Sequence, residues 1–190
     1  MKIILGSGSP RRRELLLKLG IDFEVRVSNT EEISFKKDPV EYAKELSYKK
    51  SKDIYISENE LLITADTIVS FNNEILGKPK DKIEAFNMLK KLSGNMHKVI
   101  TGVTFRTIDE IYTIEDITEV YFLRLDDNII KFYIDKYNPL DKAGGYGIQD
   151  FAGAFVERIN GDYYNVMGLP LNKIFNYLYN NGLCCLEKNF

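Results

Sequence analysis

Chemistry is first suggested by a short turn near the N-terminus, where an apolar run is followed at once by basic residues. Gly6 and Gly8 let the backbone approach a ligand closely, and Ser9 and Pro10 are suited to cap and start a helix. The free N–H groups and positive dipole end of such a helix attract anions. Arginines fill residues 11–13, where the dipole favours acids, so this helix start is unfavourable unless an anion binds. A solvated basic turn is the alternative interpretation.

A carboxylate interrupts the most apolar run of the chain. The run covers residues 61–71, and Asp66 stands near its middle. An ionised carboxylate in a buried strand is unfavourable unless it is paired or binds a metal, so Asp66 is a candidate site residue. A hydrogen-bonded core Asp is the alternative. Lys78 is a second candidate, because Pro79 holds it in an extended conformation from which its ammonium can bind phosphate as a point charge.

Further polar groups are concentrated in two loops. Glu31 and Glu32 follow a predicted strand, a pattern that fits either a surface loop or a metal-facing loop. The glycine-rich loop 138–150 contains acids, a lysine, a tyrosine and Gln149, a composition typical of binding loops. The amide of Gln149 can donate and accept side by side, as the N3–H and carbonyl oxygens of a pyrimidine require. The sole histidine, His97, has no second His or Cys nearby and is expected to be structural.

These candidates must be positioned by alternating strands and helices. Period-two apolar patterns predict strands at 2–5, 23–27, 61–71, 74–76, 97–105, 114–123 and 154–159. Helical spacing with capping residues predicts helices at about 10–19, 39–55, 81–92, 127–137 and 170–180. Asn72 and Asn73 suit a hairpin turn between two of the strands.

Composition limits the possible classes of protein. The 190 residues are 44% apolar and 28% charged, enough for one domain over residues 1–190 with a full core. The net charge of −2 lacks the basic field of a duplex-binding protein, so we expect no nucleic-acid partner. No apolar run approaches a secretory h-region or a membrane span, which predicts a soluble, cytoplasmic protein without a membrane partner. Cys184 and Cys185 are expected to be reduced packing residues.

The order of several short motifs carries a resemblance to a known family. The motifs are Ser9-Pro10-Arg11-Arg12, Ala65-Asp66-Thr67, Gly77-Lys78-Pro79, Ser93-Gly94 followed by His97, Thr101-Gly102-Val103, Lys142-Ala143-Gly144, Tyr146-Gly147-Ile148-Gln149, and Gly161-Asp162-Tyr163 through Asn165 to Gly168-Leu169-Pro170-Leu171. Over nearly its whole length the chain resembles the Maf family of nucleoside triphosphate pyrophosphatases. The resemblance implies an α/β, ITPase-like fold: a mixed twisted sheet flanked by helices, with two lobes, a central cleft and commonly a homodimer.

The resemblance also implies a reaction. This is hydrolysis between the α and β phosphates of a nucleoside triphosphate with a divalent cation, Mg²⁺ or Mn²⁺. Asp66 matches the family's proposed proton acceptor, and Glu32 matches a second acid, so both are expected to hold the metal. The implied catalytic residues are Asp66, Glu32 and Lys78. The implied substrate-binding residues are Ser9, Arg12, Arg13 and Lys50.

A smaller set of residues implies which base is preferred. Arg11, Thr67 and Gln149 match the family's discriminating positions, and this set resembles the type that acts on dTTP and UTP, not the type that prefers 7-methyl-GTP. An unpaired group in a buried polar site costs about 1–3 kcal/mol, so base-edge pairing can discriminate. The chain departs from the family at Gly6-Ser7-Gly8, at Gly145 and at Asp150, which adds a negative charge near the expected base pocket.

The main expectation is therefore removal of dTTP, UTP or modified pyrimidine triphosphates. A nucleotide-sensing regulatory protein that affects cell division is one alternative, since the family was associated with inhibition of septum formation. A nucleotidyltransferase is another, because glycine-rich basic loops also hold triphosphates in such enzymes. Release of pyrophosphate from UTP with water alone separates the first expectation from both alternatives.

Overall fold

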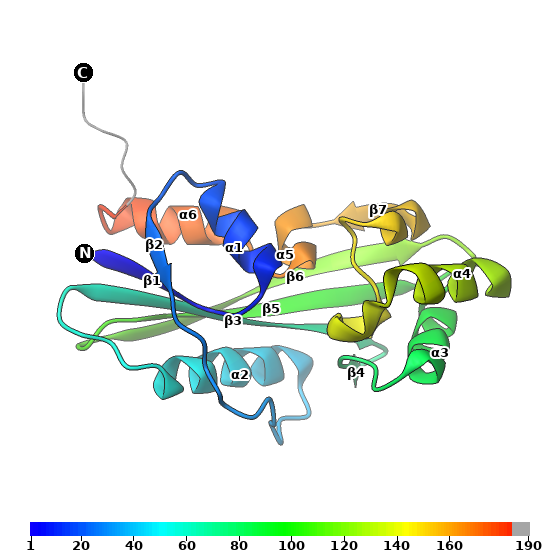
Figure 1. The fold of residues 1–190 in the computed structure, drawn as a ribbon, viewed down its shortest axis with the longest axis horizontal. Coiled ribbons are helices and arrows are strands. Elements are labelled where there is room, and N and C mark those ends of the chain that lie inside the picture. Colours follow the sequence, from blue (N-terminus) through cyan, green and yellow to red (C-terminus); the bar gives the residue numbers. More distant parts are fainter. Residues whose placement is uncertain (184–190) are drawn as a thin grey trace.

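A mixed sheet runs along the length of the molecule (Figure 1). The computed structural model describes residues 1–183, so Cys184 and Cys185 lie outside the described residues. The strands are β1 (Lys2–Gly6), β2 (Phe23–Val25), β3 (Glu60–Phe71), β4 (Glu74–Leu76), β5 (Met96–Arg106), β6 (Ile111–Phe122) and β7 (Val156–Asn160). Their order is β2-β1-β3-β5-β6-β7, with β4 paired to the end of β3. β1 is parallel to both β2 and β3, and the other pairs are antiparallel.

Helices cover both faces of this sheet. They are α1 (Pro10–Leu17), α2 (Pro39–Asp53), α3 (Lys82–Leu92), α4 (Asp127–Tyr137), α5 (Tyr163–Met167) and α6 (Leu171–Asn180), with short 3-10 helices η1 (Pro139–Asp141), η2 (Ala143–Gly145) and η3 (Phe151–Phe155). Figure 1 shows α2 on one side of the sheet, α1 and α6 on the other, and α3 and α4 together at one end. No helix within residues 1–183 is long and apolar enough to cross a bilayer.

Two hydrophobic cores follow one another along the long strands. One core joins β1, α1 and α6 to Leu61, Ile63 and Ala65 of β3. The other joins α3, α4 and η3 to Val69 of the same strand. Asp66 and Thr67 therefore lie where β3 passes from one core to the other. The expectation of an α/β fold with a mixed sheet, flanking helices and two lobes is confirmed.

Most element boundaries follow the sequence pattern, with explicable differences. The hairpin turn holds Asn72 and Asn73 at φ values of 50° and 65°, as a tight two-residue turn requires. The strand predicted from residue 154 begins at Val156, because Asp150 accepts a hydrogen bond from the Ala152 N–H and starts η3 instead. The prediction that the Ser9 side chain caps α1 is wrong, since its hydroxyl makes no capping bond.

Candidate active site

Strand alternation divides the site between the two faces of the sheet. Successive side chains of β3 point to opposite faces, so Asp66 faces α2 whereas Thr67 faces α1. The hydrogen bonds agree with this: Lys50 of α2 reaches Asp66, and Arg12 of α1 reaches Thr67. Two neighbouring residues of β3 therefore bind charged side chains from two helices that lie on opposite faces of the sheet.

A glycine brings α2 close enough to the sheet for this arrangement. Gly102 of β5 is paired with Asp66 of β3. A Cβ added to Gly102 would lie 2.4 Å from the carbonyl oxygen of Ala43, so no other residue lets the α2 backbone pack here. Lys50 follows Ala43 by two helical turns and lies on the same side of α2.

A cavity opens around Asp66 and Thr67. Its volume is about 550 Å³, within the usual range for small-molecule sites. The predicted residues that line it are Ser9, Arg11, Arg12, Glu32, Lys50, Asp66, Thr67, Lys78 and Gln149. These residues come from the N-terminal turn, the loop before α2, α2 itself, β3, the segment after β4 and the loop 138–150, so the fold brings together groups far apart in sequence.

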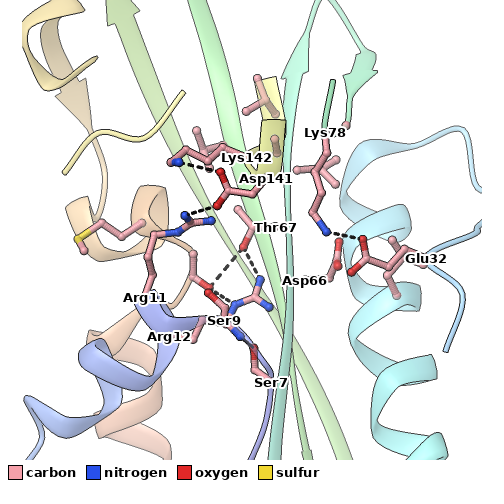
Figure 2. A pocket seen from close by; sticks show the side chains of 18 of the residues that line it. Ser7, Ser9, Arg11, Arg12, Glu32, Asp66, Thr67, Lys78, Asp141 and Lys142 are labelled. Carbon is pink, nitrogen blue, oxygen red and sulfur yellow. Dashed lines mark hydrogen bonds and ion pairs between the residues drawn. The ribbon is translucent and has the colours of Figure 1, made fainter. Parts of the chain in front are cut away.

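Two carboxylates and two lysines form one end of the site. Lys50 Nζ lies 2.5 Å from Asp66 Oδ1 and 2.8 Å from Glu32 Oε1, so both acids contact one ammonium. Lys78 Nζ lies 2.8 Å from Glu32 Oε2. Figure 2 shows Lys78 and Glu32 pointing toward each other beside Asp66. The side chains of Lys50 and Asp66 are 12% and 8% exposed, whereas those of Glu32 and Lys78 open to solvent.

The two acids differ in their protonation chemistry. Burial raises the pKa of Asp66 above its ordinary value, although Lys50 and Arg12 oppose that shift. Partial burial also acts to raise the pKa of Glu32, but hydrogen bonds and charge from Lys50 and Lys78 outweigh it and lower the pKa to about 2. Asp66 is therefore the better proton acceptor, and Glu32 stays an anion at any physiological pH.

A partly buried arginine forms the second part of the site. Arg12 donates from Nε to the Gly168 carbonyl at 2.8 Å and from Nη2 to Thr67 Oγ1 at 3.0 Å. Thr67 is held in turn by Thr101, whose hydroxyl lies 2.9 Å away. Burial lowers the pKa of Arg12, and Asp66 opposes that shift, but a guanidinium keeps its charge in either case. The site thus holds a fixed cation on the face opposite Lys50.

A third group links the N-terminal turn to the loop 138–150. Arg11 Nη1 lies 2.9 Å from Asp141 Oδ2, and Lys142 Nζ lies 2.7 Å from Asp141 Oδ1. Figure 2 shows these three side chains meeting on the other side of Thr67 from Glu32. Sequence reasoning assigned no role to Asp141 or Lys142. Both lie in the glycine-rich loop 138–150, and Lys142 opens the motif Lys142-Ala143-Gly144, which was the signal that could have indicated them.

Two predicted ligand-binding side chains have no hydrogen-bond partner within residues 1–183. The Ser9 hydroxyl and the Gln149 amide line the cavity, and neither makes a side-chain hydrogen bond within residues 1–183. Both can therefore serve a ligand without first breaking a contact. Asp150 does not line the cavity: its carboxylate accepts from the Tyr133 hydroxyl and the Ala152 N–H. The expected extra charge thus lies behind the cavity wall, held by two hydrogen bonds.

Two residues lie apart from this group. Arg13 is exposed and borders a separate shallow hollow with Leu17 and Ile21, so the fold does not bring it to the cavity with the other predicted residues. His97 is 1% exposed, and its Nε2 lies 2.7 Å from the Tyr146 hydroxyl. Burial lowers the pKa of His97 to about 3, which fits the structural role expected for it.

The carboxylates are the groups best suited to a cation. Lys50 already places one positive charge between Asp66 and Glu32, which shows that both acids can share a cation. Among residues 1–183, no three His, Cys, Asp or Glu side chains form a closed metal cluster. An open pair of carboxylates suits Mg²⁺ or Mn²⁺, because such ions commonly take their remaining oxygens from water and substrate phosphates.

Known proteins match this chain over almost its whole length. Residues 2–181 match the family of Maf-like proteins. The chain is 50% identical to a dTTP/UTP pyrophosphatase of Thermosipho africanus, over 99% of this chain and 97% of that protein. Proteins of the same name from Thermotoga maritima and Flavobacterium psychrophilum are 48% and 49% identical, covering 96% and 95% of this chain and 90% and 94% of those proteins.

Among solved structures, a HAM1 protein from Coxiella burnetii aligns with a TM-score of 0.44 at 13% identity, covering 66% of this chain and 74% of that one. The sequence matches are far closer. Because the family match spans residues 2–181 and the relatives align over nearly their full length, this chain belongs to the Maf family.

Proposed function

We propose that this protein hydrolyses dTTP and UTP to the nucleoside monophosphate and pyrophosphate. The relatives named above are dTTP/UTP pyrophosphatases, and they align with this chain from end to end. The observation that supports the proposal most is one cavity that holds a buried acid with a raised pKa, several cations and an amide with no side-chain hydrogen bond within residues 1–183. A nucleoside triphosphate needs all three kinds of group.

The cations are assigned to the phosphates. Arg12 is held rigidly by Gly168 and Thr67, so little side-chain freedom is lost when it binds an anion. Lys78 is exposed enough to leave Glu32 and follow a ligand. The Ser9 hydroxyl, which has no capping role, donates to a phosphate oxygen. As the phosphoanhydride breaks, these fixed donors stabilise the charge that develops on its oxygens.

Asp66 and Glu32 are assigned to a divalent cation, Mg²⁺ or Mn²⁺. When bound, this ion would neutralise phosphate charge and orient the attacking water. Lys50 occupies the space between the two acids, so its ammonium would have to leave that space for the ion and would then be placed to pair with a phosphate oxygen. The residues fit the ion in their charge, in their oxygen donors and in their ability to share one cation.

Asp66 accepts the proton of the attacking water. Water adds across the α–β phosphoanhydride, its oxygen forms the new P–O bond, and the bridging P–O bond breaks to release pyrophosphate. Burial raises the pKa of Asp66, which makes it a stronger base than an exposed carboxylate. General-base assistance of this kind is worth roughly 10²- to 10⁴-fold in rate.

Base preference is assigned to the opposite wall. The free amide of Gln149 pairs with the N3–H and a carbonyl oxygen of uracil or thymine. Thr67 orients Arg12, and Arg11 is held by Asp141 at the same wall.

The same proposal includes a cytoplasmic location, where these nucleotides are made and used. It also includes a homodimer, which size-exclusion chromatography with light scattering tests.

One assay tests the proposed reaction. Purified protein is mixed with each of UTP, dTTP, CTP, GTP and ATP, in Mg²⁺ or Mn²⁺, without any sugar or alcohol acceptor. We expect pyrophosphate and the monophosphate in equal amounts, with the highest kcat/KM for UTP and dTTP. Binding without turnover would instead indicate a nucleotide sensor, and turnover that needs an acceptor would indicate a nucleotidyltransferase.

A further inference from the structure

A buried tyrosine lies behind the loop that carries Gln149. Tyr133 of α4 is 0% exposed, and its ring packs against the rings of Tyr137, Phe151 and Phe155. Its hydroxyl accepts a hydrogen bond from the Gly147 N–H at 3.2 Å. The fixed ring therefore places one oxygen, at a defined position, under the start of this loop.

The same hydroxyl also holds the other end of the loop. It donates to Asp150 Oδ1 at 3.2 Å, and Asp150 Oδ1 accepts from the Ala152 N–H at 3.0 Å. The turn is closed by the Asp150 N–H, which donates to the Gly147 carbonyl at 3.2 Å. Gly147 and Asp150, the residues on either side of Ile148 and Gln149, are thus tied to a single oxygen atom.

Packing around Gly147 transmits this constraint to the amide. A Cβ added to Gly147 would lie 2.9 Å from each of Gln149 Nε2, Asp150 Oδ2 and Lys142 Cε. The Gln149 amide therefore lies close to the Gly147 backbone, so the position of that backbone limits where the amide can lie. Gln149 itself is exposed and has no side-chain hydrogen bond in the described chain, so the packing of Gly147, Asp150 and Lys142 around its amide is what restricts its direction.

We infer that Tyr133 and Asp150 are positioning residues that aim the Gln149 amide at the base and thereby set the preference for uracil and thymine. This inference rests on the proposed function. Neither residue is among those that line the cavity, so the effect assigned to them is indirect and acts through Gln149. Their effect is to hold a donor and an acceptor in the order that distinguishes uracil from cytosine, whose edge has an unprotonated N3 and an amino group.

The test compares kcat/KM for UTP and CTP in the full-length protein. Tyr133→Phe keeps the ring and its packing but removes the shared oxygen. We expect the UTP-to-CTP ratio to fall by about 5- to 10-fold, the effect of losing one well-placed hydrogen bond, mainly through a higher KM for UTP. Tyr137→Phe is the matched control, because it removes a hydroxyl of α4 that makes no side-chain hydrogen bond in residues 1–183, and it should keep the wild-type ratio.

Asp150 variants give an independent readout. Asp150→Asn keeps an oxygen that accepts from Tyr133 and Ala152, so it should keep the ratio, whereas Asp150→Ala should lower it as Tyr133→Phe does. Equal effects of Asp150→Asn and Asp150→Ala would show that the charge acts directly and would overturn the inference. An unchanged ratio in Tyr133→Phe, or equal losses on UTP and CTP, would also overturn it.

Failure of the two proposals is distinguishable. If wild-type protein hydrolyses no triphosphate, the proposed function fails and the positioning role fails with it. If the wild type prefers UTP and the Tyr133 and Asp150 variants do so to the same degree, the proposed function stands and only the positioning role is wrong. Circular dichroism at the assay temperature establishes that each variant is folded.

Discussion

Replacing Gly102 by alanine perturbs the contact that sets the distance between α2 and the sheet. The new methyl group would lie 2.4 Å from the Ala43 carbonyl oxygen, 2.6 Å from the Ala43 carbonyl carbon and 2.7 Å from the Lys44 nitrogen. All three are backbone atoms of a helix, so no side-chain rotation relieves the clash. α2 must move away from β5 as a unit.

The size of this movement follows from ordinary contact distances. Non-bonded heavy atoms pack at about 3.5–4.0 Å, so α2 must shift by about 1 Å. Overpacking of this kind costs about 1–3 kcal/mol of the free energy of unfolding. For a chain of this length, each 1 kcal/mol lowers Tm by about 2–4 °C, which predicts a fall of about 2–12 °C.

The same shift should reduce turnover beyond its effect on stability. Lys50 moves with α2, whereas Asp66 stays in β3 beside Gly102. Lys50 is assigned to a phosphate oxygen of the substrate, and a misplacement of about 1 Å in such a positioning group can lower the rate by about 10²-fold, so we expect kcat/KM for UTP to fall by about 10- to 100-fold. The assay is run well below the Tm of the variant, where the protein is folded by circular dichroism.

A second glycine provides the control for stability. A Cβ added to Gly77 meets nothing within 4 Å, so Gly77→Ala should leave Tm near the wild-type value. Since Gly77 lines the cavity, the comparison concerns Tm alone. If Gly102→Ala melted and turned over like the wild type, close packing of α2 on β5 would not be what places Lys50 beside Asp66.

Four other predictions concern the site itself. Asp66→Asn should keep its circular dichroism spectrum and lose roughly 10²- to 10⁴-fold in pyrophosphate release; near wild-type turnover would refute its role as base. Gln149→Ala should change the UTP-to-GTP ratio of kcat/KM more than it changes the Mg²⁺ concentration giving half-maximal rate, and equal losses on all bases would count against base reading. Because burial raises the pKa of Asp66 above 3.8, whereas that of Glu32 is lowered to about 2, kcat/KM should fall with decreasing pH as Asp66 is protonated, at an apparent pKa above 3.8. Arg12→Lys should raise KM for UTP by about 5- to 30-fold, since an ammonium cannot keep both hydrogen bonds of the guanidinium, and a wild-type KM would contradict this.

Periodicity and turn chemistry were sufficient to predict the sheet and its main helices. The apolar run 61–71 became β3 almost unchanged, and Asn72-Asn73 formed the expected turn, because local sterics determine such features. The helix start at Pro10 was also predicted, but the Ser9 cap was not formed. A serine hydroxyl can either cap a helix or bind a ligand, so the sequence alone does not say which partner it takes.

The site was predictable as a set of residues but not as a set of contacts. Asp66 was identified because a carboxylate in an apolar strand needs a partner. That its partner is Lys50 depends on the packing of α2 across β3 and β5, which no local pattern encodes. The Gly168 carbonyl that accepts from Arg12 could not be predicted for a different reason: every residue has a backbone carbonyl, so residue type does not indicate which one accepts.

Asp150 illustrates how the fold changes the meaning of a residue. In sequence it is a negative charge next to Gln149, where it should disfavour an electron-rich base edge. In the structure Tyr133 and the Ala152 N–H both donate to its carboxylate, which supports the loop from behind the cavity wall. Because a buried carboxylate with hydrogen-bond donors is less unfavourable than an unpaired one, these two bonds let the chain carry an acid next to Gln149.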